Sequence, residues 1–576
     1  MTTDAIIVGS GPGGATAADV LTAAGWSVVI FEKGRNHLID LADPSRLLGD
    51  FSNDEIKFIE RYFLGPDPFL EPRTFRVGPE DGDHAFVGEV NSIPSTVGGG
   101  GTHADGKVPR FREEDFAMLS SRGPHEGASV ADWPLDYAEL EPFYAEAERM
   151  IGVSGQAGAN PFAAWRSGPY PMPPGPSMYG SKLSSAAAES LGFHPYPAPG
   201  ATNSEHYDGR PACNNCGFCA FFGCPIHAKG DPVAMLQRAL LTGNAELRPE
   251  TFVSRIRTAG DRATGVDFIG PDGVEHSMDA RHVVVAGGAI ETPRLLLLSR
   301  IDHPLIGRHL MTHFQTIVVG GFAHLRLHGE RGRAVTEMHN DALVPDDASR
   351  AAAKEAGLPW MKGGMVEHGG PSLPILEAKI YPWGRTHNES MRSSPMRDRM
   401  WAFTMQGEDL PVATNRIDLD PTVRDVRGFP VARYTYKPHR HELAAAAHHG
   451  PRLAAILEVM GAGWTSIVTS PGTAGGPGGR TTEHAPMSRH VMGTVRMGTD
   501  PDIGGRRPRA APPVGERGHR RLLALRHLLG LRTHADPGRP GGPLGDGHGR
   551  LTAPSGPRGG YRVTDEAVSP MKPSRA

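Results

Sequence analysis

The chain has 576 residues, with 60 Lys and Arg against 64 Asp and Glu and a formal net charge of −4 at pH 7. This length allows a large core and more than one domain, and the near balance of charge excludes a whole-chain electrostatic attraction to nucleic acid or to an anionic membrane. No apolar stretch is long enough for a membrane span, and the first apolar run follows Asp4 without a basic leader, so we expect a cytoplasmic protein.

The first 32 residues have the pattern of a dinucleotide-binding unit. A buried strand is predicted over residues 5–8, a helix over 15–24 and a second strand over 26–31. The turn after the first strand supplies four residues expected to approach a pyrophosphate: Gly9, Ser10, Gly11 and Gly14. Glu32 follows the glycines by about 20 residues, where an acid can accept hydrogen bonds from a ribose. The alternative is an ordinary glycine-rich turn, but strand, turn, helix, strand and acid agree with dinucleotide binding.

A second glycine-rich segment follows a stretch in which apolar residues have no regular spacing. Residues 40–94 are predicted to be irregular, and four consecutive glycines then follow Val97. Such a run favours backbone pressed against a flat or anionic ligand, and a flexible loop is the alternative.

Further elements follow from caps and apolar runs. A helix is expected from Asp136, because Glu139 has the spacing of a capping box. The apolar run 282–288 predicts a second buried strand that ends in glycines. Its helix is expected to have Thr292 as N-cap and Pro293 at the first helical position. This unit is expected to close the same parallel sheet.

The fold class predicted is α/β, with a Rossmann-like domain assembled from separated segments and a second domain with a mainly antiparallel sheet. The second domain is predicted because residues 315–480 contain β-branched and aromatic segments separated by turn residues. The expected division of the chain is 1–314 for the nucleotide-binding domain, 315–483 for the substrate domain, 484–502 for a return to the first domain, and 503–576 for an anomalous tail.

All four cysteines lie within twelve residues: Cys213, Cys216, Cys219 and Cys224. Their spacing, C-x2-C-x2-C-x4-C-P, is one residue from a ferredoxin-type run whose thiolates hold an iron-sulfur cluster. Structural zinc sites more often pair two separated knuckles, and a cytoplasmic location argues against disulfides. Three interpretations of this segment therefore stay open: an iron-sulfur cluster, a metal-free or disulfide-linked loop, and a zinc site.

Five motifs in order give the chain a resemblance to the glucose-methanol-choline (GMC) oxidoreductase family, from about Asp4 to about Asp502. These motifs are the Gly9 turn with Glu32, residues 97–106 with 109–111, residues 287–293, residues 307–313, and residues 490–498. The last has the pattern HxxGTxRMG and is the most specific of the five.

The resemblance implies bound FAD, a substrate domain with an antiparallel sheet over the flavin, and oxidation of alcohols. Beyond the first turn, the residues that it implies for cofactor binding are Gly98, Gly99, Thr102, His103 and Val253. Val253 has a second interpretation as a core strand residue, and structural roles are open for His103 and His313. The family usually places hydroxyl and amide side chains where this chain has Gly100, Gly101 and Thr102, so the resemblance does not fix the contacts to the flavin there.

The proposed catalytic base is His490. Oxidising an alcohol removes a hydride from carbon and a proton from oxygen, and imidazole suits the proton transfer because its ordinary pKa lies near neutrality. Among 27 histidines, His490 stands out because it begins the HxxGTxRMG pattern, where the family has its catalytic histidine.

The composition changes abruptly after Asp502, and residues 504–560 contain no Lys, Ile, Phe, Tyr, Trp, Met, Asn or Gln. One interpretation is a basic disordered extension. The other is a frameshift, because GC-rich codons for residues 515–537, when they are translated one base later, can encode a segment similar to the family's closing one. In relatives this segment supplies an Asp facing the flavin and the second polar partner of the catalytic histidine. We therefore expect the chain with this tail to bind FAD poorly or to fold incompletely.

The function predicted is an FAD-dependent dehydrogenase acting on the CH-OH group of a sugar, polyol or other alcohol. By analogy with bacterial sugar dehydrogenases of the family, its electrons would pass through an iron-sulfur cluster to a cytochrome or quinone. The alternatives are an FAD alcohol oxidase using oxygen, and an inactive flavin-binding remnant.

Overall fold

The computed structural model describes most of the chain up to residue 498. The described residues are 3–48, 70–80, 86–88, 90, 93–217, 219, 223–301, 303–328, 332–333, 335–369, 384–394, 398–469, 486 and 488–498. The anomalous tail at 503–576 lies outside them. No helix of the described part is long and apolar enough to cross a membrane.

The N-terminal unit is built on a six-stranded sheet with the order β6-β2-β1-β9-β8-β7. Its strands are β1 (Thr3–Val8), β2 (Val28–Phe31), β6 (Ala245–Arg248), β7 (Phe252–Ala259), β8 (Arg262–Ile269) and β9 (Glu275–Val285). Strands β6, β2, β1 and β9 are parallel, with Ala5 opposite both Val28 and His282. Strands β8 and β7 continue the sheet as an antiparallel extension. The prediction that the run 282–288 joins the first strand in one parallel sheet is confirmed.

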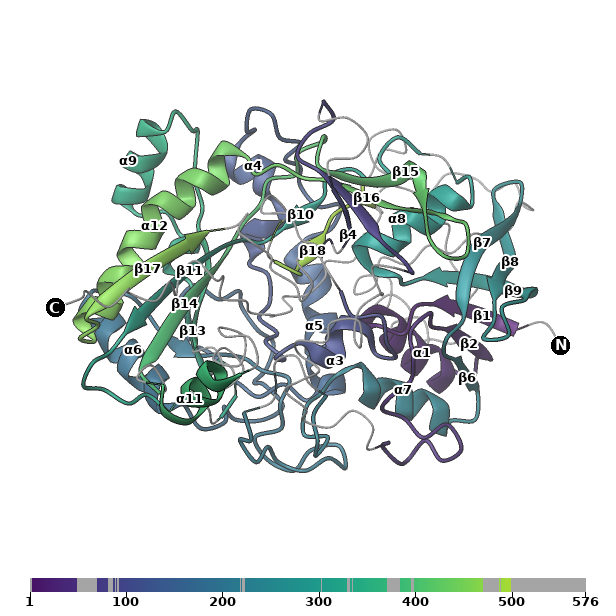
Figure 1. The fold of residues 1–576 in the computed structure, drawn as a ribbon, viewed down its shortest axis with the longest axis horizontal. Helices are drawn as coiled ribbons and strands as arrows, with labels where there is room; N and C mark the ends of the chain where they lie inside the picture. The colour runs from purple at the N-terminus through teal and green to yellow at the C-terminus, as the bar shows by residue number, and fades with distance from the viewer. Residues whose placement is uncertain are drawn as a thin grey trace.

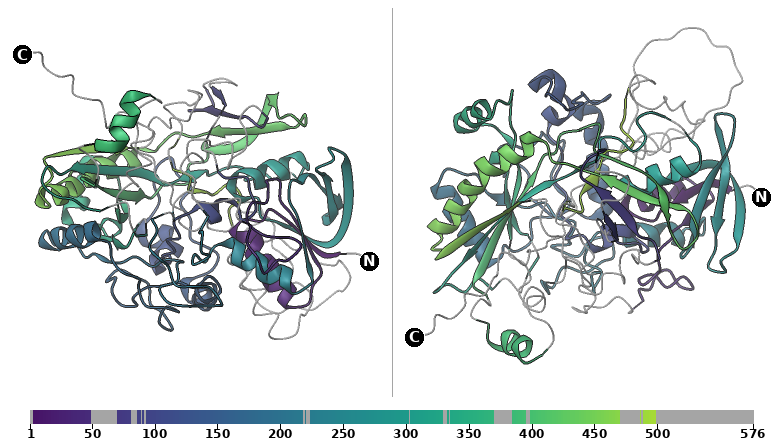
Figure 2. Two further views of the ribbon diagram at one scale, coloured as in Figure 1. Left: turned by 60° about the horizontal axis from the view of Figure 1, so that its bottom comes forward. Right: turned by 45° about the horizontal axis from the view of Figure 1, so that its top comes forward.

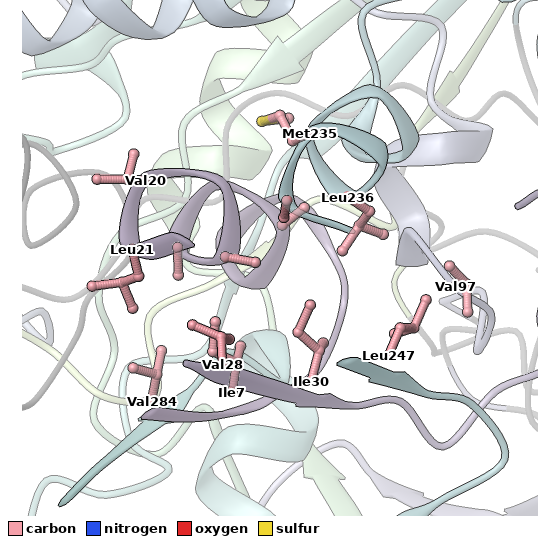
Figure 3. Close-up of a cluster of buried hydrophobic side chains, with 14 of the residues drawn as sticks. Ile7, Val20, Leu21, Val28, Ile30, Val97, Met235, Leu236, Leu247 and Val284 are labelled. Carbon is pink, nitrogen blue, oxygen red and sulfur yellow. The ribbon is translucent and has the colours of Figure 1, made fainter. Parts of the chain in front are cut away.

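Two helices cover one face of this sheet, α1 (Pro12–Ala23) and α7 (Pro232–Leu241). Figure 3 shows the core between them and the strands, built from apolar side chains. Labelled members of this core are Ile7, Val20, Leu21, Val28, Ile30, Val97, Met235, Leu236, Leu247 and Val284. The expected helix after the first turn therefore exists, and it begins three residues earlier than the apolar pattern indicated.

Helix α8 (Gly288–Leu298) follows β9 directly, with Gly287 as its N-cap. The expectation of Thr292 as N-cap and Pro293 at the first helical position is wrong, because Pro293 lies inside the helix. Proline has no N–H and cannot donate to the carbonyl four residues earlier, which is that of Ala289. That carbonyl accepts a hydrogen bond from Thr494 instead.

The second unit is a six-stranded antiparallel sheet with the order β17-β11-β14-β13-β12-β5. Its strands are β5 (Tyr196–Pro197), β11 (Phe314–Gly321), β12 (Glu337–His339), β13 (Gly364–Gly369), β14 (Met400–Gly407) and β17 (Trp464–Thr469). Helices α6 (Tyr179–Ser190) and α12 (Arg440–Val459) pack on it, and α9 (Asp347–Glu355) packs on α12. Figures 1 and 2 show this sheet with α12 at the opposite end of the molecule from β1 and β2. The predicted antiparallel sheet is confirmed, and the boundaries expected for the domains stay a prediction.

Two smaller sheets lie between these units. One has the order β15-β16-β3-β4, with strands β3 (Arg73–Arg76), β4 (Phe86–Gly88), β15 (Arg416–Arg424) and β16 (Pro430–Thr435). The prediction that residues 40–94 are irregular is therefore wrong for β3 and β4, because β3 finds its parallel partner β16 more than 350 residues later. The other is the two-stranded ladder of β10 (Met311–Thr312) and β18 (Val491–Met492).

The remaining helices are mostly short. They are α3 (Gly99–His103), α4 (Met118–Arg122), α5 (Tyr137–Ile151) and α11 (Arg385–Ser393), with 3-10 turns at Glu113–Phe116 and Asp341–Leu343. Helix α5 has the predicted capping box between Asp136 and Glu139.

Candidate active site

The turn between β1 and α1 is shaped so that only glycine fits at two positions. Gly9 has φ 101°, and a Cβ there would come within 2.6 Å of the carbonyl oxygen of Ala286. A Cβ at Gly14 would overlap the carbonyl oxygen of Gly9. Helix α1 starts at this turn and no side chain caps its N-cap residue Gly11, so its first N–H groups point towards a ligand position beyond the turn.

Glu32 lies at the end of β2 with its carboxylate beside this turn. Its Oε2 accepts hydrogen bonds from the backbone N–H and the hydroxyl of Ser10 at 3.0 and 2.7 Å, and its Oε1 accepts from the N–H of Gly34. The carboxylate of Glu32 is thus fixed at the carboxyl ends of the parallel strands, where the sequence placed it.

The second glycine segment packs directly against the first. The N–H of Gly98 donates to the hydroxyl of Ser10 at 3.0 Å, and a Cβ at Gly99 would come within 3.1 Å of the Cα of Gly11. Residues 99–103 form the short helix α3, which corrects the flexible-loop alternative. Thr102 and His103 are buried there. The close approach of backbone that the glycine run predicted is made, in this structure, to the nucleotide turn itself.

The buried ammonium of Lys229 holds α3 in place. Its Nζ donates to the carbonyl oxygens of Thr102 and Ala104 at 2.6 and 2.8 Å, and to that of Cys219 at 3.3 Å. The cysteine segment is therefore tied to the second glycine segment through one lysine side chain.

His490 immediately precedes β18, which pairs with β10 so that Val491 lies opposite Thr312. This pairing brings the imidazoles of His490 and His313 together, with their Nδ1 atoms 2.8 Å apart and their ring planes at 90°. His490 is buried and His313 is partly buried. The two histidines come from motifs 177 residues apart in the chain.

Thr494 anchors this histidine segment to the first unit. Its Oγ1 donates to the carbonyl oxygen of Ala289 at 2.8 Å, which is the carbonyl that Pro293 leaves without a helical donor. Its backbone has φ 68°, a left-handed conformation that is uncommon for a β-branched residue. Backbone hydrogen bonds with Gly307 and Arg308 hold it there.

A buried ion cluster lies beside the histidine pair. The ammonium of Lys107 pairs with Asp105 at 2.9 Å and with Glu367 on β13. Burial by itself lowers the pKa of Lys107, but the Coulombic attraction of Asp105 and Glu367 outweighs it and raises that pKa. Burial, with a smaller contribution from the Lys107 charge, lowers the pKa of His313 to about 4.

Comparison with known proteins decides the family. The GMC oxidoreductase N-terminal model matches residues 176–315 and the C-terminal model matches residues 411–504. The 2-methyl-1,2-propanediol dehydrogenase of Mycolicibacterium austroafricanum is 29% identical over 514 residues, covering 87% of this chain and 86% of the relative. The chain belongs to the GMC oxidoreductase family.

Two further comparisons agree with this assignment. The gluconate 2-dehydrogenase flavoprotein of Pantoea cypripedii is 28% identical over 553 residues, covering 86% of this chain and 85% of the relative. The crystal structure of pyridoxine 4-oxidase from Mesorbium loti superposes with a TM-score of 0.51 at 16% identity, covering 87% of this chain and 90% of that one. This structural likeness confirms the predicted fold of a GMC oxidoreductase.

GMC oxidoreductases are FAD-binding flavoproteins, and the residues of this chain fit such a cofactor. The two glycine segments form a cradle that side chains would fill, and the uncapped start of α1 offers donors for a pyrophosphate. Within the described residues, the Oγ1 of Thr102 is buried without a hydrogen-bond partner. Val253 is different, because it packs in the core between β7, β8 and α8, and the role that the resemblance implies for its backbone stays a prediction.

The four cysteines fit a metal site less well. Their thiols are half-buried and unpaired in disulfides, and burial raises the pKa of Cys219 to about 12. In the part of the chain that the structure describes, no three His, Cys, Asp or Glu side chains are arranged to hold a metal ion. The iron-sulfur interpretation gains no support from this geometry and stays a prediction.

Sequence reasoning missed several residues that lie near His313, the partner of His490. Asp105, Lys107 and Glu367 carry no recognisable spacing, because the ion cluster joins residues more than 250 positions apart. Asp409, which binds the backbone around His313, lies 97 positions from Thr312 and 95 from Phe314. His313 lies in a family-like motif, and that motif was the one available signal.

Two surface pockets, of about 700 and 520 Å³, are lined by other residues. The first lies around Trp360 and Arg440 and the second around Asp19 and Arg238. The candidate active site therefore lies at the glycine cradle and the histidine pair and away from these two pockets.

Proposed function

We propose that this chain is an FAD-dependent dehydrogenase that oxidises the CH-OH group of a sugar, polyol or other alcohol. One observation carries the proposal. Residues 286–289 contact both halves of the site, since Ala286 lies against Gly9 of the nucleotide turn and Ala289 accepts the hydrogen bond from Thr494 of the histidine segment. A cofactor cradled at the turn and a base at His490 would thereby be held in one rigid frame.

Different residues would bind the cofactor and transfer the proton. The first turn of α1 would hold the pyrophosphate, and Glu32 the ribose. Bound FAD supplies the acceptor for the hydride that leaves the substrate carbon. His490 would take the hydroxyl proton as that hydride leaves, so the alcohol loses two electrons and two hydrogens and becomes a carbonyl.

The substrate class rests on chemistry and on relatives. A base that removes a hydroxyl proton requires a CH-OH donor, and two relatives named above are dehydrogenases of a diol and of gluconate. Those names also favour a dehydrogenase that passes its electrons to an acceptor such as a cytochrome or quinone. Hydrogen peroxide formed in step with product would instead show an oxidase.

The cysteine segment gives a separate prediction about electron transfer. If Cys213, Cys216, Cys219 and Cys224 hold an iron-sulfur cluster, anaerobically purified protein contains iron and acid-labile sulfide. Finding neither removes the cluster from the proposal and leaves the alcohol oxidation untouched.

The experiment that tests the proposal is the variant His490→Ala with the exposed His206→Ala as control. We expect His490→Ala to bind as much FAD as the unaltered chain does, while the rate of alcohol oxidation falls by about 10² to 10⁴, the range for a lost acid-base group. The control should keep the full rate. An unchanged rate in His490→Ala excludes the assignment, and full FAD content without reduction by any alcohol would leave a flavin-binding remnant.

A further inference from the structure

His313 and His490 meet through matching ring nitrogens. The Nδ1 atoms are 2.8 Å apart and the rings are perpendicular. A hydrogen bond between two Nδ1 atoms requires a proton on one and a lone pair on the other. The tautomer of each histidine therefore fixes that of its partner.

Alcohol oxidation needs one of the two arrangements. A base at Nε2 of His490 must have its lone pair there, so the proton of neutral His490 must lie on Nδ1. His490 then donates through Nδ1 to the Nδ1 lone pair of His313. When His490 takes a second proton at Nε2, the same hydrogen bond becomes charge-assisted and stabilises the imidazolium.

We propose that His313 is a positioning residue that sets His490 in the tautomer with Nε2 unprotonated, and that Asp409 holds His313 in the required orientation. This inference rests on the proposed function, in which His490 is the base. The relationship is comparable to the one in which a carboxylate orients a catalytic histidine, with a neutral imidazole in place of the carboxylate.

The groups around His313 keep its ring neutral, so that its Nδ1 can accept a hydrogen bond. His313 is partly buried, and this burial and the nearby Lys107 charge both lower the pKa of its ring and favour the neutral form. The Lys107 ammonium is itself fixed between Asp105 and Glu367. A neutral His313 offers an Nδ1 lone pair that a protonated ring would lack.

Asp409 binds the backbone on both sides of His313. Its Oδ2 accepts from the N–H of Thr312 and its Oδ1 from the N–H of Phe314, each at 2.7 Å. The hydroxyl of Tyr436 donates to Oδ2 at 2.9 Å. Strand β10 is only two residues long. The carboxylate of Asp409 therefore helps to fix the backbone that carries His313.

Two variants of the full chain at the same position separate positioning from simple packing. His313→Leu removes the acceptor, whereas His313→Asn keeps a side-chain oxygen that can accept near the former Nδ1. The readout that needs no cofactor is nitrogen NMR of protein labelled with ¹⁵N-histidine, with the His490 signals assigned by their loss in His490→Gln. The second readout is kcat and KM for alcohol oxidation by FAD-loaded protein.

In the wild-type chain we expect His490 to carry its proton on Nδ1. In His313→Leu the proton should move to Nε2, and kcat should fall by about 10² to 10⁴ with KM little changed. His313→Asn should keep the wild-type tautomer and a rate within about tenfold of wild type. Asp409→Asn should give a mixture of tautomers, because its amide group cannot accept from both backbone N–H groups.

An unchanged His490 tautomer in His313→Leu overturns the positioning role, whatever the activity. If that variant does not fold, the wild-type spectrum decides, since His490 with its proton on Nε2 contradicts the inference. Failure of the proposed function looks different: His490→Ala would then keep its rate while the tautomer change in His313→Leu persisted.

Discussion

The hydroxyl of Ser10 bridges two segments of the cofactor cradle, since it donates to the carboxylate of Glu32 at 2.7 Å and accepts from the N–H of Gly98 at 3.0 Å. All the atoms involved are buried. The strand end, the first glycine turn and the second glycine segment therefore meet at one hydroxyl group.

Ser10→Ala removes this bridge and leaves the N–H of Gly98 without its acceptor. An unsatisfied buried group costs about 1–3 kcal/mol, so we expect the free energy of unfolding to fall by this amount and FAD to bind more weakly. Chemical denaturation and FAD titration measure the two effects. The exposed Ser190→Ala is the control, and equal stability of the two variants would contradict the bridge.

Gly11→Ala distinguishes a cofactor cradle from an ordinary glycine turn. A Cβ at Gly11 meets nothing within 4 Å, and its backbone at φ −61° suits alanine. The variant should thus fold with wild-type stability. It should nevertheless bind FAD about tenfold or more weakly, because the added methyl group lies where the pyrophosphate approaches the backbone. Gly168→Ala, also with open space around its Cβ, should bind FAD normally. Wild-type FAD affinity in Gly11→Ala would favour the ordinary turn.

The first unit could be predicted from sequence because its signals are local. The strand, turn and helix around Gly9 are contiguous, and the capping box at Asp136 spans four residues. His490 was found through a motif. By contrast, β3 is stabilised by pairing with β16, and no local pattern records a partner so far away.

The histidine pair shows the same limit within the site. Nothing in the motif around His313 indicates that its Nδ1 meets that of His490, because the contact depends on the two-residue ladder of β10 and β18. Pro293 was misplaced for a related reason. Its position inside α8 is tolerated because Ala289 gains a donor from Thr494, which lies about 200 residues later.

Thr494→Val tests the link between the two units. Valine keeps the shape of threonine but cannot donate to the carbonyl oxygen of Ala289. We expect a loss of about 1–3 kcal/mol in the free energy of unfolding and a fall in kcat that exceeds any rise in KM, since His490 lies four residues away on the same segment. Thr258→Val on the exposed part of β7 is the matched control. Wild-type kcat in Thr494→Val would show that this hydrogen bond does not position His490.

The lowered pKa of the partly buried His313 makes the free energy of unfolding depend on pH. Its pKa is about 4 in the folded chain against an ordinary value of 6.5, so the unfolded chain binds the proton more readily between these values. The contribution of neutral His313 to the free energy of unfolding is therefore fully present above pH 6.5 and is lost as the pH falls towards 4. Between pH 7 and pH 5 the loss is roughly 2 kcal/mol. Denaturation at both pH values should show a smaller loss in His313→Asn than in the wild type. Equal losses would contradict the burial of a neutral His313.

The central claim is that this chain binds FAD and uses it to oxidise an alcohol. The most direct measurement is the absorption spectrum of FAD-reconstituted protein during anaerobic addition of sugars, polyols and simple alcohols, with the chain as printed and with its reading frame restored after Asp502. We predict a flavin spectrum that at least one substrate bleaches, with higher FAD content in the restored chain. A restored chain that stays colourless after reconstitution, or a flavin that no alcohol reduces, would contradict the account.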